Sequence, residues 1–325
     1  MKLSEILGQP RATTHLQNAL EQDRLAHGLI FAGPAGVGKR TTALALARAL
    51  FCTAEIPDGT GGCEQCEDCH LIEAGTHPNL LIQDMARARE EKSTASQISI
   101  AQIRRLRSDL ALRGVRGHRK VAIIEPAEKL TTDAQNALLK TLEEPPAGSV
   151  LILVTSNADA LLPTIRSRCQ RIHFSPLSPS HLATILGRDG YSEEEASNIA
   201  SIADGSLHEA ARLSSEESQE QSLQIRERLS GLQTLSTPEL LDFAAELASG
   251  KGEERRDRMA LQGSIFLDWA RARMVEAAEN NDPEGTRASL KILKRIHGTT
   301  RDLSHYANAQ LTWESLLLDL REMRP

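Results

Sequence analysis

Gly28-Leu-Ile-Phe-Ala-Gly33-Pro-Ala-Gly36-Val-Gly38-Lys39-Arg40-Thr41 is the stretch of sequence that decides the fold. Gly33, Gly38 and Lys39 match the pattern G-x-x-x-x-G-K of a phosphate-binding loop, in which backbone N–H groups surround phosphate oxygens and the lysine supplies a positive charge. The apolar run 29–32 predicts a short buried strand before the loop, and the apolar spacing in 42–51 predicts a helix after it. The stretch therefore predicts a nucleotide-binding core of the α/β class.

The residue after the lysine departs from this pattern, because Arg40 stands where a serine or threonine would bind Mg²⁺. Thr41 lies one place late, about 100° further round the helix. Glu125, at the end of a predicted strand, could assist a metal, but Pro126 stands where ATPases of this type carry the glutamate that polarises water. Glu128 is expected to face solvent. We therefore expect a loop that can hold ADP or ATP without turnover. The degenerate nucleotide site comprises Gly33, Gly36, Gly38, Lys39, Thr41 and Glu125.

The composition of the 325 residues is that of an ordinary globular protein, with 40% hydrophobic and 25% charged residues. The sequence has no apolar run of about 18 residues and no signal-peptide pattern, so we expect a cytoplasmic protein without a membrane segment. A net charge of −6 argues against a chain that coats DNA by itself, but it says nothing about a local basic surface. An aromatic content of 3% argues against recognition of single strands by base stacking.

Strand and helix patterns alternate in the first half of the chain. Apolar runs predict further strands at 79–83, 120–125, 149–155 and 170–174. A capping box at Thr132–Gln135 predicts the start of a helix between two of them. Alternation of this kind indicates a parallel sheet with helices on both faces.

After Phe174 the sequence has no further strand pattern. Short helical patterns occupy 180–187, 192–203 and 206–213, and longer helices follow, one of them capped by Thr237. The predicted organisation is an α/β nucleotide domain at 1–175 with a cysteine module at about 52–70, a small helical lid at 176–213 and an all-helical domain at 214–325.

Four of the five cysteines fall within eighteen residues: Cys52, Cys63, Cys66 and Cys69. The spacing C-x-x-C-x-x-C with one earlier cysteine supplies four thiolates, which suit a closed tetrahedral Zn²⁺ site. Free thiols in a loop and an iron–sulfur cluster are the alternatives. We expect a structural zinc ion, because a polar, glycine-rich loop has no other reason to collect four cysteines.

Basic residues gather between positions 104 and 120. Arg113, Arg116 and Arg119 are candidates for contact with a DNA backbone, although a solvated helix face would have the same composition. Arg168 follows a central strand at the rim of the predicted sheet. It could be surface decoration, or it could reach a phosphate held by an adjacent subunit.

Several motifs, in this order, resemble the bacterial clamp-loader family within the AAA+ ATPases. They are the loop 33–39, the cysteine module, Asn136-Ala-Leu-Leu-Lys-Thr-Leu-Glu-Glu-Pro-Pro146 and Ser167-Arg168-Cys169. The resemblance extends over about residues 1–213 and implies an AAA+ P-loop domain with a helical lid, followed by a helical collar that joins subunits. It also implies partners, namely the gamma/tau and delta subunits and, through the complex, the sliding clamp and primed DNA.

Three departures resemble the largely non-hydrolysing delta-prime type of that family, a subunit of the DNA polymerase III holoenzyme. Arg40 and Pro126 replace residues of the hydrolytic site, and His208 stands where the gamma/tau type carries an arginine. The resemblance implies that Arg168 acts as an arginine finger on the ATP of a neighbouring gamma subunit. Two other interpretations stay open: an active gamma/tau-type ATPase, since the loop lysine is retained, and a non-replicative AAA+ scaffold that contains zinc.

Overall fold

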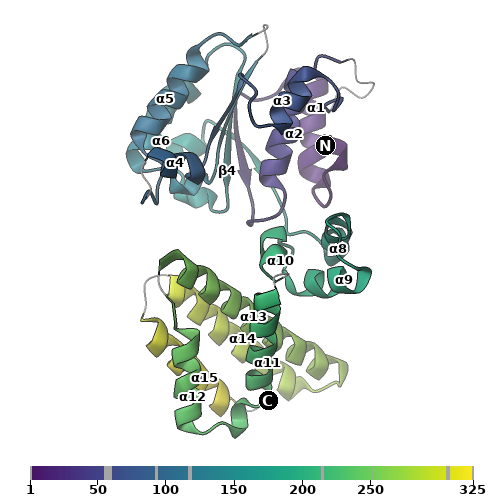
Figure 1. Cartoon of the computed structure of the whole chain (residues 1–325), viewed down its shortest axis with the longest axis vertical. Coiled ribbons are helices and arrows are strands. Elements are labelled where there is room, and N and C mark those ends of the chain that lie inside the picture. The colour runs from purple at the N-terminus through teal and green to yellow at the C-terminus, as the bar shows by residue number, and fades with distance from the viewer. Residues whose placement is uncertain are drawn as a thin grey trace. The chain divides into compact units, whose positions relative to one another are not determined.

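The computed structural model describes residues 2–54, 61–91, 94–115, 119–213, 216–250, 252–304 and 308–323. Two compact units make up the chain. The first comprises Met1–Ala200 with Asp204–His208, and the second comprises Ser201–Ala203 with Glu209–Pro325. The described strands all belong to the first unit, and the described part of the second consists of helices and their connections (Figure 1).

One parallel sheet forms the centre of the first unit. Its strands are β1 (Gly28–Ala32), β2 (Leu80–Gln83), β3 (Lys120–Ile124), β4 (Ser149–Thr155) and β5 (Gln170–His173). They pair in the order β2-β3-β4-β1-β5, which confirms the predicted parallel sheet. β1, β3 and β4 are buried along their whole length, as their apolar runs require of central strands, whereas β5 at the edge exposes three of its four residues.

Helices cover both faces of this sheet (Figure 1). One side carries α1 (Pro10–Glu21), α2 (Lys39–Phe51) and α3 (Glu67–Glu73), and the other carries α4 (Met85–Glu91), α5 (Ile100–Ala111), α6 (Thr132–Glu143) and the short α7 (Pro163–Arg166). Side chains of a strand point alternately to the two faces. In β1, Leu29 and Phe31 therefore join the core beneath α1 and α2, while Ile30 and Ala32 join the core beneath α5 and α6.

One helix start in this unit differs from the prediction. α6 begins after Thr131, whose hydroxyl accepts a hydrogen bond from Ala134 N at 3.2 Å, so the capping box predicted at Thr132–Gln135 is wrong. The physical reason is that Gln135 is buried and has another partner. Its Oε1 accepts a hydrogen bond from Leu162 N at 2.8 Å, which links α6 to the turn before α7.

Beyond the sheet the described chain is helical. α8 (Pro179–Arg188), α9 (Glu193–Ile202) and α10 (Leu207–Leu213) confirm the three short helical patterns. The longer helices are α11 (Glu216–Ser230), α12 (Thr237–Leu247), α13 (Gly252–Glu279), α14 (Pro283–Ser304) and α15 (Ala309–Glu322). The cap of α12 is Ser236, one residue before the predicted Thr237, because Glu239 completes a capping box with Ser236.

The second unit has its own apolar core, in which the buried rings of Phe266 and Trp313 lie 5.1 Å apart. The boundaries at 175 and 213 stay a prediction. Within the described ranges, no helix combines the length and the apolar character needed to cross a membrane.

Candidate functional site

The phosphate loop joins β1 to α2. Gly36 and Gly38 have φ angles of +70° and +91°, in the left-handed region that favours glycine. Close packing also excludes a side chain at two positions of the loop. A Cβ on Gly36 would lie 2.4 Å from His208 N, and a Cβ on Gly33 would lie 2.3 Å from Phe174 O. The packing of the fold therefore requires glycine at both, whether or not the loop meets a phosphate.

Residues 206–208 cover the loop within the first unit. Leu207 N donates a hydrogen bond to Gly36 O at 2.9 Å, and Ser206 Oγ donates one to Ala35 O at 3.0 Å. His208, which we expected to replace an arginine, contributes to the wall of the adjacent cavity. The loop is thus held from two sides, by the end of β5 and by the segment that opens α10.

A cavity of about 480 Å³ lies beside the loop. Five members of the predicted nucleotide site line it: Gly36, Gly38, Lys39, Thr41 and Glu125. The sixth, Gly33, opens the loop and accepts a hydrogen bond from Lys39 Nζ at 2.7 Å. The structure therefore brings the predicted nucleotide site together around one cavity.

Lys39 is buried and directed at its own loop. Its Nζ donates to the carbonyl oxygens of Gly33 and Pro34. Burial lowers the pKa of Lys39, and the negative charges of Glu125 and Glu128 oppose that shift. A bound phosphate would have to replace these carbonyls as the partner of the ammonium group.

Arg40 forms an ion-pair network at the mouth of the cavity. Its Nη1 lies 3.0 Å from Glu125 Oε2, at the end of β3, and its Nη2 lies 3.3 Å from Asp84 Oδ2, at the end of β2. Burial disfavours the charged guanidinium, but the hydrogen bond and charge of Glu125, with those of Asp84, outweigh it and raise the pKa of Arg40. Glu125, which we expected to assist a metal, is instead the partner of an arginine.

Sequence reasoning missed Asp84 and misplaced Glu128. Asp84 directly follows β2, and an acidic residue at the carboxyl end of a parallel strand was the available signal. Glu128 is half-buried and lines the cavity, and its Oε1 accepts a hydrogen bond from Ser156 N at 3.2 Å. The predicted exposure was wrong because β3 and β4 are parallel neighbours, so the segment after β3 lies beside the residues that follow β4.

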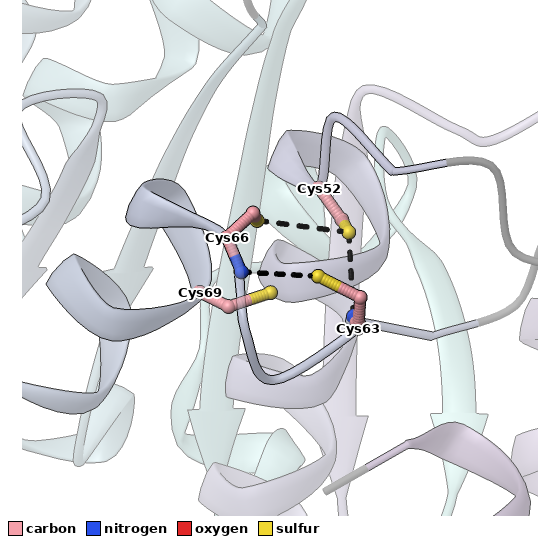
Figure 2. A group of neighbouring side chains, drawn as sticks. All are labelled: Cys52, Cys63, Cys66 and Cys69. Carbon is pink, nitrogen blue, oxygen red and sulfur yellow. Dashed lines mark hydrogen bonds between the residues drawn. The ribbon is translucent and has the colours of Figure 1, made fainter.

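The cysteine module lies at the other end of α2. Cys52 follows the last turn of α2, Cys66 caps α3 and Cys69 lies within α3 (Figure 2). The four sulfur atoms, including that of Cys63, lie within 4.8 Å of one another, and those of Cys52 and Cys66 are 3.9 Å apart. Tetrahedral Zn–S bonds of about 2.3 Å place sulfurs about 3.8 Å apart. The cluster could therefore hold a metal ion of that size.

Backbone N–H groups donate hydrogen bonds to sulfurs of the cluster. Cys66 N donates to Cys63 Sγ at 3.2 Å, and Cys63 N donates to Cys52 Sγ at 3.3 Å (Figure 2). Burial alone would raise the pKa of Cys66, but hydrogen bonds from Cys69 and Thr53, with those of neighbouring thiols, lower it to about 6. Burial raises the pKa values of Cys52 and Cys69, so a metal ion, whose ligand is the thiolate, would have to displace protons from these two thiols.

Arg168 lies at the opposite edge of the sheet from the phosphate loop. β1 and β5 run parallel, the loop follows β1, and Arg168 precedes β5. Strands of this length separate their two ends by roughly 15 Å. Arg168 Nη2 lies 2.9 Å from Glu143 Oε1, at the end of α6, and Nη1 donates to Thr164 O at 3.1 Å. Arg168 is therefore placed away from this chain's own phosphate loop.

The structure describes two of the three candidate DNA-binding arginines. Arg113 is exposed, Arg119 is paired with Asp23, and Arg116 lies outside the described residues. Lys120 is buried and its Nζ donates to Asp109 O. DNA contact stays a prediction.

A parallel sheet with helices on both faces, a glycine-rich phosphate loop after β1 and a segment that covers the loop define the class of this protein. It is a phosphate-loop α/β protein with the strand order β2-β3-β4-β1-β5.

The chain belongs to the family described as DNA polymerase III, delta subunit, whose model matches residues 8–178. It is similar to DNA polymerase III subunit delta' of Bacillus subtilis, with 37% identity over 207 residues that make up 63% of this chain and 59% of that protein. It is also similar to subunit delta' of Pseudomonas aeruginosa, with 40% identity over 144 residues, or 44% of this chain and 42% of that protein. The matches thus span less than two thirds of these relatives.

Similarity also extends to tau and gamma proteins. Subunit tau/gamma of Haemophilus influenzae is 32% identical over 216 residues, which cover 65% of this chain and 30% of that protein. Among solved structures, a DNA polymerase III gamma subunit-related protein from Thermotoga maritima aligns over 96% of this chain and 99% of its own, with 19% identity and a TM-score of 0.44.

Proposed function

We propose that this chain is a delta-prime-type subunit of a bacterial clamp loader, which assembles with gamma/tau and delta subunits and helps to load a sliding clamp onto primed DNA. The similarity to proteins named subunit delta' supports this function. The observation that carries the choice of the non-hydrolysing type is the pairing of Arg40 with Glu125 and Asp84. An active gamma/tau-type site needs a hydroxyl and a free carboxylate for Mg²⁺ where this chain has an internal ion pair.

In this proposal the chain contributes to hydrolysis through Arg168, acting in trans. Its position at the edge of the sheet away from the chain's own loop supports a role at a neighbouring subunit's ATP. A guanidinium there would neutralise charge that develops on the transferred phosphoryl group. Gly33, Gly36, Gly38 and Lys39 would hold a nucleotide as a static ligand.

The cysteine cluster would hold structural Zn²⁺ through Cys52, Cys63, Cys66 and Cys69. Four thiolates closing a tetrahedral site leave no open position for chemistry, which supports a structural role. The compartment we propose is the reducing cytoplasm, where cysteines stay available as metal ligands. The helices 176–213 would act as a lid, and 214–325 as the collar that joins subunits.

The experiment that tests the proposed function is reconstitution. The full chain is mixed with purified gamma/tau and delta subunits of the same organism, and the composition of the complex is measured by size-exclusion chromatography with native mass spectrometry. We expect one defined complex that loads the clamp and loses loading when this chain is omitted. A chain that stays apart from both subunits would favour the non-replicative scaffold instead, and ATP hydrolysis by the chain alone, lost in Lys39→Ala, would favour the gamma/tau type.

A further inference from the structure

Mg²⁺, which accompanies nucleotides in most phosphate-loop proteins, does not fit the residues of this cavity. Mg²⁺ takes oxygen ligands in an octahedron at about 2.0–2.1 Å. Arg40, at the position of the usual hydroxyl, carries N–H donors and no acceptor. Thr41 is the nearest hydroxyl in sequence, and it is exposed one position further along α2. Two carboxylates line the cavity, and both have other partners: Glu125 Oε2 lies 3.0 Å from the Arg40 guanidinium, and Glu128 Oε1 accepts a hydrogen bond from Ser156 N at 3.2 Å.

The charged side chains that line the cavity are equal in number and opposite in sign without a divalent cation. Two cations, Lys39 and Arg40, and two carboxylates, Glu125 and Glu128, line it, and Asp84 shares the guanidinium from outside the lining. A serine at position 40 would remove one positive charge and leave the lysine alone against the two carboxylates of the lining, with Asp84 close by. That excess of negative charge is what a divalent cation normally offsets in a phosphate loop. Arg40 thus supplies the positive charge from within the chain.

Arg40 also has donors left for a phosphate. Its two carboxylate partners engage Nη1 and Nη2, which each carry two N–H bonds, and the planar guanidinium has a fifth at Nε. The side chain is 43% exposed and lines the same cavity as the loop glycines and Lys39. A guanidinium suits phosphate oxygens, because its donors form a fixed fork that matches their spacing.

We propose that Arg40 takes the place of the divalent cation, so that this cavity binds the phosphate groups of a nucleoside diphosphate or triphosphate free of metal. The inference deepens the static nucleotide site of the proposed function and rests on it. Arg40 bridges the phosphates to Glu125 and Asp84, as a metal would bridge phosphates to a carboxylate. Hydrolysis does not follow, because the residue after Glu125 is Pro126, which offers no side-chain acceptor to a water.

The test measures the Kd of ADP for the isolated full chain by calorimetry, in buffer with Mg²⁺ and in buffer with EDTA. We expect the two Kd values to agree within about twofold, because no metal enters the site. In Arg40→Ser, the Kd in EDTA should rise about tenfold or more, since a charge-assisted hydrogen bond to phosphate contributes roughly that factor. Mg²⁺ should restore much of the lost affinity in this variant.

Two further variants keep the result interpretable. Arg87→Ser removes an exposed arginine three residues beyond Asp84 and should leave both Kd values unchanged. Arg40→Lys keeps the charge but not the fork, and its Kd in EDTA should lie between those of wild type and Arg40→Ser. If thermal melting shows that Arg40→Ser is unfolded, the Arg40→Lys variant is used for the comparison with wild type instead.

Three results would overturn the inference: wild-type affinity that falls tenfold or more when Mg²⁺ is removed, Arg40 variants that bind ADP in EDTA as wild type does, or wild type that binds no ADP in either buffer. None of these three results depends on whether the chain assembles with the other subunits. A chain that assembles but fails here keeps the proposed function, and a chain that binds ADP without metal but does not assemble keeps this inference alone.

Discussion

The two ends of α2 carry two recognisable motifs that the structure treats differently. The phosphate loop, at the start of α2, keeps its glycines and its lysine. The lysine, however, donates hydrogen bonds to loop carbonyls, and Arg40 forms ion pairs with the nearby carboxylates. After its last residue, the cysteine module keeps all four sulfurs at distances that suit a metal. A glycine pattern can therefore persist for packing alone, whereas four thiols have no packing reason to converge.

The largest effect should come from breaking the cysteine module. Cys66→Ser should release the bound metal and lower the free energy of unfolding of the first unit by about 3 kcal/mol or more, because metal binding to a closed site contributes directly to folding. Metal content by mass spectrometry and urea unfolding measure both effects.

Cys169→Ala is the matched control for that variant. Burial raises the pKa of Cys169 to about 12, so its side chain behaves as a small apolar group rather than a ligand. It should keep the full metal content. If the Cys66→Ser protein retained its metal and its stability, the four sulfurs would not be a metal-binding site. The cysteine module would then no longer differ from the phosphate loop at the other end of α2.

The next effect tests whether packing explains the glycines of the loop. Gly36→Ala should lower the free energy of unfolding by roughly 2–3 kcal/mol, because it combines a left-handed φ with a Cβ 2.4 Å from His208 N. Gly38→Ala has a left-handed φ but meets no atom within 4 Å, so it should cost only about 1 kcal/mol. Urea unfolding measures both. Equal losses would mean that the close approach of residues 206–208 is unimportant, and the packing explanation would fail.

If the loop is catalytically inactive, the chain's contribution to ATP turnover must come from elsewhere. Arg168→Ala should lower ATP hydrolysis and clamp loading by the reconstituted complex about tenfold, because an arginine finger stabilises the charge of the transferred phosphoryl group. Arg166→Ala is the matched control, since Arg166 lies two residues away and pairs with Asp159. Its rates should stay near wild type. Wild-type rates in Arg168→Ala would remove Arg168 from the mechanism.

Much of the fold was predictable because its signals are local. The strands at Gly28–Ala32, Lys120–Ile124 and Ser149–Thr155 are continuous apolar runs, and the cysteines lie close together in sequence. The network around Arg40 was not predictable, because its partners Asp84 and Glu125 are 44 and 85 residues away. Sheet order decides which strand ends meet, and a single sequence does not reveal that order.

The smallest effect should come from Glu143, the partner of Arg168. Both side chains are partly exposed, at 50% and 38%, and exposed ion pairs contribute roughly 0–1 kcal/mol. Glu143→Gln should therefore change the free energy of unfolding by about 0.5 kcal/mol or less, close to the adjacent control Glu144→Gln. Such a weak pair would let Arg168 leave Glu143 for a neighbour's phosphate at little cost. If Glu143→Gln alone lowered the free energy of unfolding by about 2 kcal/mol, the ion pair would be important for stability. Arg168 could then leave Glu143 only at a high cost, which would weaken the proposal that Arg168, rather than the phosphate loop, carries this chain's part in catalysis.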